Sequence, residues 1–470
     1  MDKIIKNQFI QGDLSKVIWR SSLPMVTAIL ALLAYDLLES SLIALSGAQS
    51  LASLGFTLPL TTGMTAIAIG ISIRSNNLVV KNACLQPDIL AKSIVRLLIS
   101  ASIATLVFSL LALVINEPLL TLLGNENLLV GKEDHRIIEQ QNAYMSIRYL
   151  AWICLVLLWQ INAILRGLGH IRLASGIMLS WLALKALLAI ALLVPESQWY
   201  QNGLMGIAYV HAISDTLCAL VSFALLGQKL FPQKSEVHFS DLAIQKPHFD
   251  TVIIMLQQLV TPLSMSILTM IAAKMGYSYV AAFALLFRLE ALFLLFPMVL
   301  TTSLPAIIGT NFWSGHFERA KQAYQLVFGF VVASQLGIAV LLLLYSDFIA
   351  ALICPQEEIV WHLKAYLSWV PWGYLGAGCA IVYQSCLNAE GKPAQASMVG
   401  IMHRLVFLLP LTFIGAMLAN EQSFYQGIML GHLSAGLYVF YLFYKKHIQN
   451  KELLNLQLDC NKLTIHEKGK

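Results

Sequence analysis

Long apolar runs separated by short polar connections dominate this chain of 470 residues. An apolar helix needs about 20 residues to cross roughly 30 Å of hydrocarbon, and the runs reach that length. They are continuous rather than alternating, which excludes the shorter strands of a membrane β-barrel. The pattern predicts twelve membrane-spanning helices, at 17–45, 50–73, 89–116, 141–165, 172–194, 203–227, 249–273, 278–308, 320–345, 361–387, 394–417 and 424–445.

The second half of the chain repeats the first at an offset of about 222 residues. LRGLGHIRLAS (165–175) aligns with LNAEGKPAQAS (387–397), and GIAYVH (206–211) aligns with GIMLGH (427–432). The first pair lies in the loop after the fourth span of each half, and the second pair lies in the middle of the sixth span of each half. Since six spans is an even number, the halves share one orientation, and parallel repeats of this kind occur in transporters that handle substrate between the halves. We expect an all-α integral membrane fold with two parallel six-helix lobes around a central cleft.

A polar stretch from Gln228 to Asp250 separates the two repeats and serves as the predicted linker. The expected organisation is an N-terminal lobe (1–230), a cytoplasmic linker (231–248), a C-terminal lobe (249–447) and a cytoplasmic tail (448–470).

Composition supports a membrane protein and excludes several other classes. Hydrophobic residues make up 58% of the chain and charged residues 12%, against about 45–50% and about 25% in soluble proteins. This excludes a soluble enzyme, a nucleic-acid-binding protein and a disordered chain. The seven cysteines form no CxxC pair and no metal-ligand spacing, so we expect small buried hydrophobes rather than a metal site. We expect no cofactor and no nucleic-acid partner.

The basic residues indicate an orientation in the membrane. If the N-terminus is cytoplasmic, most of the 30 lysines and arginines fall on the cytoplasmic side, as the positive-inside rule requires. The outer connections then hold only Lys132, Arg136, Lys274 and Lys364. The polar N-terminus and the long run after Arg20 do not resemble a cleavable signal peptide. We predict a multi-pass protein of the cell (inner) membrane with both termini in the cytoplasm.

Ionisable side chains fall within the predicted spans, where each costs about 2.5–3.5 kcal/mol on insertion scales and needs a reason. Asp36 and Glu39 are three residues apart and therefore share one helix face. Two carboxylates so close in a low dielectric repel each other, so one of them takes up a proton more readily. We predict that Glu39, helped by Asp36, is the ion-coupling site. The structural alternative is a buried ion pair or a hydrated helix end.

Three further residues are candidate modulators of that site, and a proline is the candidate hinge of the first span. Lys185 lies in the same lobe and competes in this hypothesis with a proton or Na⁺ for the carboxylate pair. Glu290 falls near the middle of the eighth predicted span. Asp215 has no partner that the sequence reveals, so a structural role is favoured. Pro24 lies twelve and fifteen residues before the two carboxylates, and because a proline bends a helix, it is the predicted hinge.

The histidines His211 and His432 occupy equivalent positions in the two repeats. A lone histidine on an apolar helix is usually a packed core residue, so packing is favoured over a proton relay. With His403, they are the candidate bases of a remote alternative, a membrane-embedded acyltransferase. No second catalytic group stands at a fixed spacing from them, and an enzyme has no reason to repeat six helices.

Several motifs, spread over essentially the whole chain, resemble those of one known family. SLPM (22–25) and YDLLESSLIALSGAQSLASLG (35–55) are similar to the first helix of the multidrug and toxic compound extrusion (MATE) family, with Glu39 at its aspartate and Asp36 at the neighbouring asparagine. LRGLGHIRLAS resembles the family's R-G-x-G-D-x-R-x-A loop, and LNAEGKPAQAS its G-K-P loop. The segment 288–323 resembles the R-I-E-x-L…P-x-x-G-Q-N-x-G segment of its second half.

Two departures from the family pattern affect the expected coupling. The family's N-x-x-L-D-P motif is replaced by LKALLAIALL, which puts Lys185 near the asparagine and Ala189 near the aspartate. The glutamate of Na⁺-coupled branches has no counterpart in QQLVTPLSMSIL, where Gln257 and Gln258 are the polar residues. Both favour a coupling acid in the N-terminal lobe and H⁺ over Na⁺, with Na⁺ at Glu39 and Asp36 as the other possibility.

The resemblance implies a secondary active antiporter that exports amphipathic, cationic drugs or toxic compounds by alternating access. Its partners are small-molecule substrates and the lipid bilayer, and we expect a monomer. A flippase of lipid-linked or polysaccharide precursors is the alternative within transporters. A broad basic cavity would favour the flippase.

Overall fold

The computed structural model describes residues 9–45, 48–85, 89–118, 134–192, 203–230, 249–275, 279, 282, 286, 289–353, 357–418 and 422–467. In these ranges every regular element is a helix. The first half contains α2 (Leu14–Leu45), α3 (Ala48–Leu85), α4 (Leu90–Val114), α6 (Asp134–Gly167), α7 (Ile171–Leu192) and α8 (Gly203–Leu230). The second half contains α9 (Phe249–Met275), α11 (Leu295–Trp313), α12 (Phe317–Leu344), α13 (Ser346–Ile353), α14 (Glu357–Ala389), α15 (Pro393–Ile401), η5 (Met402–Leu408), α16 (Leu409–Met417) and α17 (Ser423–Glu467).

The predicted all-α membrane fold is confirmed. Ten of the described helices are long and apolar enough to cross a membrane. The two other predicted spans correspond to α3 and α14, which pack along α6 and α17 inside the two lobes. The predicted linker, 231–248, lies outside the described residues, and so does part of the eighth predicted span.

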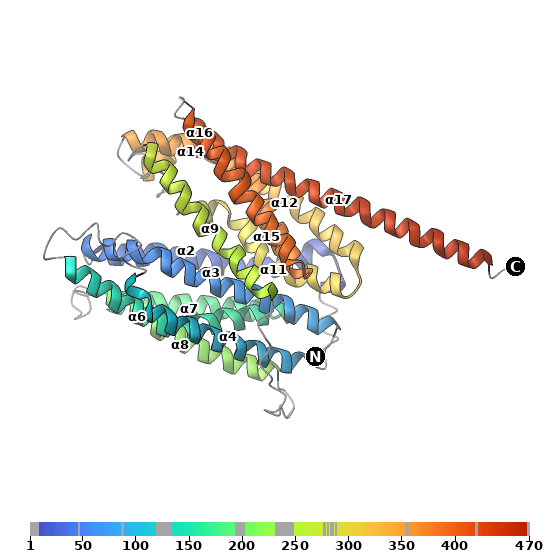
Figure 1. Ribbon diagram of the computed structural model, residues 1–470, viewed down its shortest axis with the longest axis horizontal. Coiled ribbons are helices and arrows are strands. Elements are labelled where there is room, and N and C mark those ends of the chain that lie inside the picture. The colour runs from blue at the N-terminus through green and yellow to red at the C-terminus, as the bar shows by residue number, and fades with distance from the viewer. Residues whose placement is uncertain are drawn as a thin grey trace.

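The helices form two lobes, one from the first half of the chain and one from the second half (Figure 1). In the first lobe α3 packs along α6, α6 along α8, and α2 along α7. In the second lobe α14 packs along α17 and α12, and α16 along α17. The last helix, α17, continues past the bundle toward the C-terminus (Figure 1). The segment predicted as a tail after residue 447 is therefore helical through Glu467.

Equivalent turns in the two lobes confirm the repeat that the sequence contains. Gly169 ends α6 with φ +82°, and Gly391 ends α14 with φ +77°. After each glycine the next backbone N–H bonds back five residues, from His170 to the Leu165 carbonyl at 2.8 Å and from Lys392 to the Leu387 carbonyl at 2.9 Å. Glycine adopts this left-handed conformation without a Cβ clash. The turn redirects the chain into α7 in one lobe and α15 in the other.

Two predicted spans differ from the helices that form. The second span, predicted to end at residue 73, continues as α3 to Leu85. Of the polar residues beyond 73, Ser75, Asn76 and Asn77 are buried, and Asn76 Nδ2 donates to the Ala163 carbonyl of α6 at 3.0 Å. The eleventh span contains a π-helical segment, η5, directly before Pro410. Proline lacks the N–H of a regular helical bond, and a π-helical segment shifts the bonding pattern locally.

The lobes contact each other mainly through α3 with α9 and through α11 with α2 and α3. Small residues permit this approach. A Cβ at Gly70 of α3 would lie 2.9 Å from Met255 Cα of α9, and one at Gly309 of α11 would lie 2.8 Å from Val80 Cγ1 of α3. Ser22 of α2 and Ser303 of α11 share a hydrogen bond of 2.8 Å. Away from this line of contact the two lobes diverge (Figure 1).

Candidate functional site

A chain of polar contacts connects three helices inside the first lobe, and Glu39 stands at one end of it. Glu39 lies on α2 with 16% of its side chain exposed. Its Oε2 is 3.0 Å from Nε2 of His211 on α8. The carboxylate predicted from the sequence as the coupling acid therefore has a titratable imidazole as its direct partner.

Lys185 of α7 occupies the other side of the imidazole. Its Nζ lies 2.6 Å from His211 Nδ1 and 3.4 Å from Asp215 Oδ1. Lys185 and Asp215 have only 4% and 2% of their side chains exposed. Trp181 Nε1 donates to the same Asp215 oxygen at 2.8 Å, and the Lys185 ammonium lies 4.1 Å from the centre of the Trp181 ring.

Helix periodicity explains why these groups meet. Trp181 and Lys185 are four residues apart on α7, and His211 and Asp215 are four residues apart on α8. Side chains at this spacing share one face of a helix, and α7 packs against α8. The pair on α7 therefore lies opposite the pair on α8. Glu39 joins them because α2 also packs on α7.

The contacts determine which nitrogen of His211 carries the hydrogen in the neutral ring. A lysine ammonium has donors only, so Nδ1 accepts from Lys185. Nε2 then carries the hydrogen and donates it to the Glu39 carboxylate. The network is a carboxylate, an imidazole, an ammonium and a second carboxylate in series. Because removing one member leaves a neighbouring charge unpaired in a buried site, the four groups depend on one another.

Other groups of the same lobe act on this network. Arg148 of α6 is buried, and its charge acts on Glu39, His211 and Asp215. The Tyr35 ring packs edge-on to the His211 ring, with centroids 6.2 Å apart. Asp36 is exposed and interacts electrostatically with Glu39 and Lys185. The predicted pair is thus unequal, because Glu39 belongs to the network and Asp36 lies at its exposed edge.

The structure assigns Lys185 a partner that differs from the expected one. The sequence hypothesis placed Lys185 against the Asp36 and Glu39 pair, whereas its contacts are with Asp215 and His211. The imidazole of His211 separates the ammonium from Glu39. Asp215, for which the sequence revealed no partner, is the counter-ion of Lys185.

Pro24 lies in the first half of α2, inside the helix. Its carbonyl accepts hydrogen bonds from Thr27 Oγ1 at 2.9 Å and from the Ser175 hydroxyl of α7. Since proline cannot donate a backbone bond to the preceding turn, α2 has one backbone bond fewer at this point. Ser175 ties that segment to α7, the helix that carries Lys185.

Glu290 lies in the second lobe, where it is buried and interacts electrostatically with Arg404 of η5. Beside it, Tyr366 and Tyr374 share a hydrogen bond of 2.7 Å between their hydroxyl groups. A modulating effect of Glu290 on the Glu39 site stays a prediction. Arg288, expected to point away from Glu290, is outside the described residues.

The equivalent histidine of the second lobe makes a parallel contact. His432 Nδ1 lies 2.8 Å from His403 Nε2. In both lobes the Nδ1 atom of the histidine on the last helix faces a nitrogen from the span that follows the glycine turn, Lys185 on α7 in one lobe and His403 on η5, after α15, in the other. Sequence reasoning gave His211 a packing role. The four-residue pairs 181/185 and 211/215 were the signal that could have identified it as part of the site.

Comparisons with known proteins agree with this fold. Residues 254–414 match the MatE family model. A FAD transporter of Shewanella oneidensis is 26% identical over 455 residues, covering 93% of this chain and 96% of that protein.

Solved structures extend the fold likeness to nearly the whole chain. The Vibrio cholerae MATE transporter VcmN in its bent form is 22% identical, with 96% of this chain and 98% of that chain covered and a TM-score of 0.79. A MOP superfamily transporter from Pyrococcus furiosus is 18% identical, with 95% and 98% covered and a TM-score of 0.78.

Proposed function

We propose that this chain is a secondary active antiporter of the MATE type that exports amphipathic organic compounds in exchange for H⁺. Residues 254–414 match the MatE family model, and nearly the whole chain is similar to a FAD transporter and to a solved MATE transporter. MATE proteins are transporters, so the alternative of a membrane-embedded acyltransferase is set aside. The hydrogen bond between Glu39 and His211 is the observation that carries the proposal.

Protonation of Glu39 changes how strongly α2 is held to the rest of its lobe. The ionised carboxylate is attracted to the charges of Lys185 and Arg148 and accepts a hydrogen bond from His211. A proton on Glu39 removes that attraction, since only the charged form has it. The part of α2 beyond Pro24 is then free to bend. Each proton that enters and leaves would thus alternate α2 between two positions.

The charges near Glu39 favour H⁺ over Na⁺ as the coupling ion. A sodium ion at Glu39 would lie close to the positive charges of Lys185 and Arg148, which act on this carboxylate. Like charges in a low dielectric repel strongly. A proton instead joins the carboxylate covalently and leaves no separate ion to accommodate.

Two cargo classes follow from different observations. The family resemblance favours amphipathic cations, for which exposed Asp36 offers a negative charge. The likeness to a FAD transporter over nearly the full length of both chains favours a flavin dinucleotide as the second candidate.

Transport by proteoliposomes tests the coupling and separates the cargoes. Wild type, Glu39→Gln and the control Glu117→Gln, which removes an exposed carboxylate after α4, would each be assayed with ethidium and with FAD. An imposed ΔpH would be compared with a Na⁺ gradient. We expect ΔpH-driven transport of one cargo in wild type and Glu117→Gln, and none in Glu39→Gln. Transport driven by Na⁺, or transport that survives Glu39→Gln, contradicts the proposal.

The same proposal places the protein in the cell inner membrane with both termini in the cytoplasm. Reporter fusions at the C-terminus test this. Fluorescence of a fused green fluorescent protein agrees with a cytoplasmic C-terminus, and activity of a fused periplasmic phosphatase contradicts it.

A further inference from the structure

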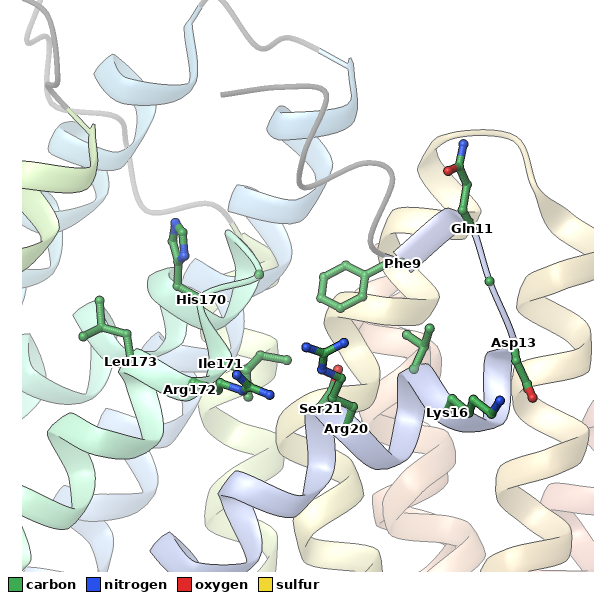
Figure 2. A pocket seen from close by; sticks show the side chains of 13 residues that line it. Phe9, Gln11, Asp13, Lys16, Arg20, Ser21, His170, Ile171, Arg172 and Leu173 are labelled. Atoms are coloured by element: carbon green, nitrogen blue, oxygen red, sulfur yellow. The ribbon is translucent and has the colours of Figure 1, made fainter.

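A cavity of about 720 Å³ opens at the end of the first lobe where α2 and α7 begin (Figure 2). The first turns of these two helices, the turn Gly169–His170 and the segment Phe9–Gly12 line it. The cavity lies far along α2 from Glu39, because residues 16–21 line it. It is therefore separate from the network that the proposed coupling uses.

Three basic side chains line this cavity: Lys16, Arg20 and Arg172. In Figure 2 the side chain of Arg172, from α7, extends toward α2, and the side chain of Arg20, from α2, extends toward Phe9 on the same side of the cavity. One carboxylate, Asp13, also lines the cavity, and its Oδ1 accepts the Ser15 backbone N–H at 3.0 Å. Cations that line one cavity repel each other unless an anion lies between them. The lining thus carries an excess of positive charge.

The second lobe holds one wall of the cavity in place. Arg319 of α12 donates to the Gly12 carbonyl at 2.9 Å. Asn311 of α11 donates to the Phe9 carbonyl at 3.2 Å. Because these bonds fix the segment Phe9–Gly12, the shape of this open cavity depends on both lobes.

The position of the cavity along α2 matches the level of lipid headgroups. Trp19 and Leu23, one and two turns into α2, are exposed apolar residues. Tryptophan concentrates at the membrane interface, so the first turns of α2, where Lys16 and Arg20 lie on either side of Trp19 in the sequence, lie at the headgroup level. Basic pockets between membrane helices at this level bind phosphate-bearing headgroups.

We propose that this cavity binds a phosphate-bearing anion, with Arg20 and Arg172 as its main ligands and Lys16 in support. Guanidinium groups bind phosphate oxygens in a bidentate manner. Either a phospholipid headgroup or a soluble phosphate compound supplies this chemistry. The proposal does not depend on the coupling ion, because the cavity lies apart from the Glu39 network.

Binding measurements on purified, detergent-solubilised protein test the site with two probes. The first probe is inorganic pyrophosphate, measured by titration calorimetry. The second is phosphatidylglycerol, compared with phosphatidylcholine by the number of lipids retained in native mass spectrometry. The variant Arg20→Gln/Arg172→Gln removes both guanidinium groups. The control Lys321→Gln/Lys445→Gln removes two lysine charges outside the cavity.

We expect at least one probe to bind wild type and the control equally, and the cavity variant about tenfold or more weakly, because charge-assisted bonds to phosphate are lost. Pyrophosphate binding identifies a soluble ligand, and retention of phosphatidylglycerol alone identifies a lipid. Absence of binding of both probes to wild type overturns the proposal. Equal weakening in the control does the same, because it would indicate general surface charge. A cavity variant that fails to fold is replaced by Arg172→Gln alone.

Discussion

His211 Nδ1 lies 2.6 Å from Lys185 Nζ, so the lysine determines which ring nitrogen of the imidazole is available to Glu39. With Nδ1 occupied, only Nε2 reaches the carboxylate. Lys185 is held in turn by Asp215. The lysine thus acts on Glu39 through the orientation of a ring rather than by direct pairing.

Replacing His211 by alanine should impair transport more than folding. The substitution removes a hydrogen bond to a charged carboxylate, worth about 1.5–3 kcal/mol, which corresponds to roughly a 10- to 100-fold change in an equilibrium constant. We expect a reduction of that order in ΔpH-driven transport by proteoliposomes, together with a lowered melting temperature that still leaves the protein folded under assay conditions. His432→Ala, the equivalent change in the other lobe, is the control. An equal loss of transport in both variants would remove the special role of His211.

Lys185 and Asp215 should show strong coupling in stability. Lys185→Met leaves Asp215 as an unpaired buried charge, which costs about 3–5 kcal/mol. Asp215→Leu leaves the lysine unpaired at a similar cost. The double variant should be more stable than either single variant, because it leaves neither of the two charges. Denaturant unfolding in detergent measures this cycle.

Lys274→Met serves as the control for that cycle, because Lys274 is exposed at the end of α9. Such surface changes usually stay within about 0.5 kcal/mol. Additive effects of Lys185→Met and Asp215→Leu would show that the pair does not act as a unit.

Pro24→Ala should stiffen α2 and slow transport. Alanine restores a backbone N–H within the helix and favours a straight helix. We expect equal or higher thermal stability together with a lower maximal rate of transport and a similar apparent KM. Pro262→Ala, in the interior of α9, is the matched control. A Pro24→Ala variant with the wild-type rate would show that α2 bends elsewhere or not at all.

Arg319→Ala should loosen the contact between the lobes at the end where α2 begins. The substitution removes the bond to the Gly12 carbonyl. Cys84 reports on this region, since its Sγ lies 3.6 Å from Ser314 Oγ across the lobe contact. We expect faster maleimide labelling of Cys84, measured by mass spectrometry of the peptide that contains it. Lys321→Ala, on the same helix, should label at the wild-type rate.

The sequence by itself determined the fold class and the repeat. Continuous apolar runs of about 20 residues admit few solutions other than membrane helices. The paired glycine turns were visible as matching segments, and Gly169 and Gly391 both adopt the positive φ that such turns need. Membrane helices and glycine turns depend on the length of an apolar run and on the residue type at a turn. Both can be read from the sequence directly.

Only the tertiary structure decided which ionisable groups are partners. Glu39 and His211 are 172 residues apart, and their contact depends on how α2, α7 and α8 rotate about their axes when they pack. The sequence contained the pairs 181/185 and 211/215 but not the rotation that turns them toward each other. The cavity at Arg20 and Arg172 likewise requires two helix ends and a segment held by the other lobe. Side-chain contacts between distant segments arise from packing, and a linear pattern does not determine packing angles.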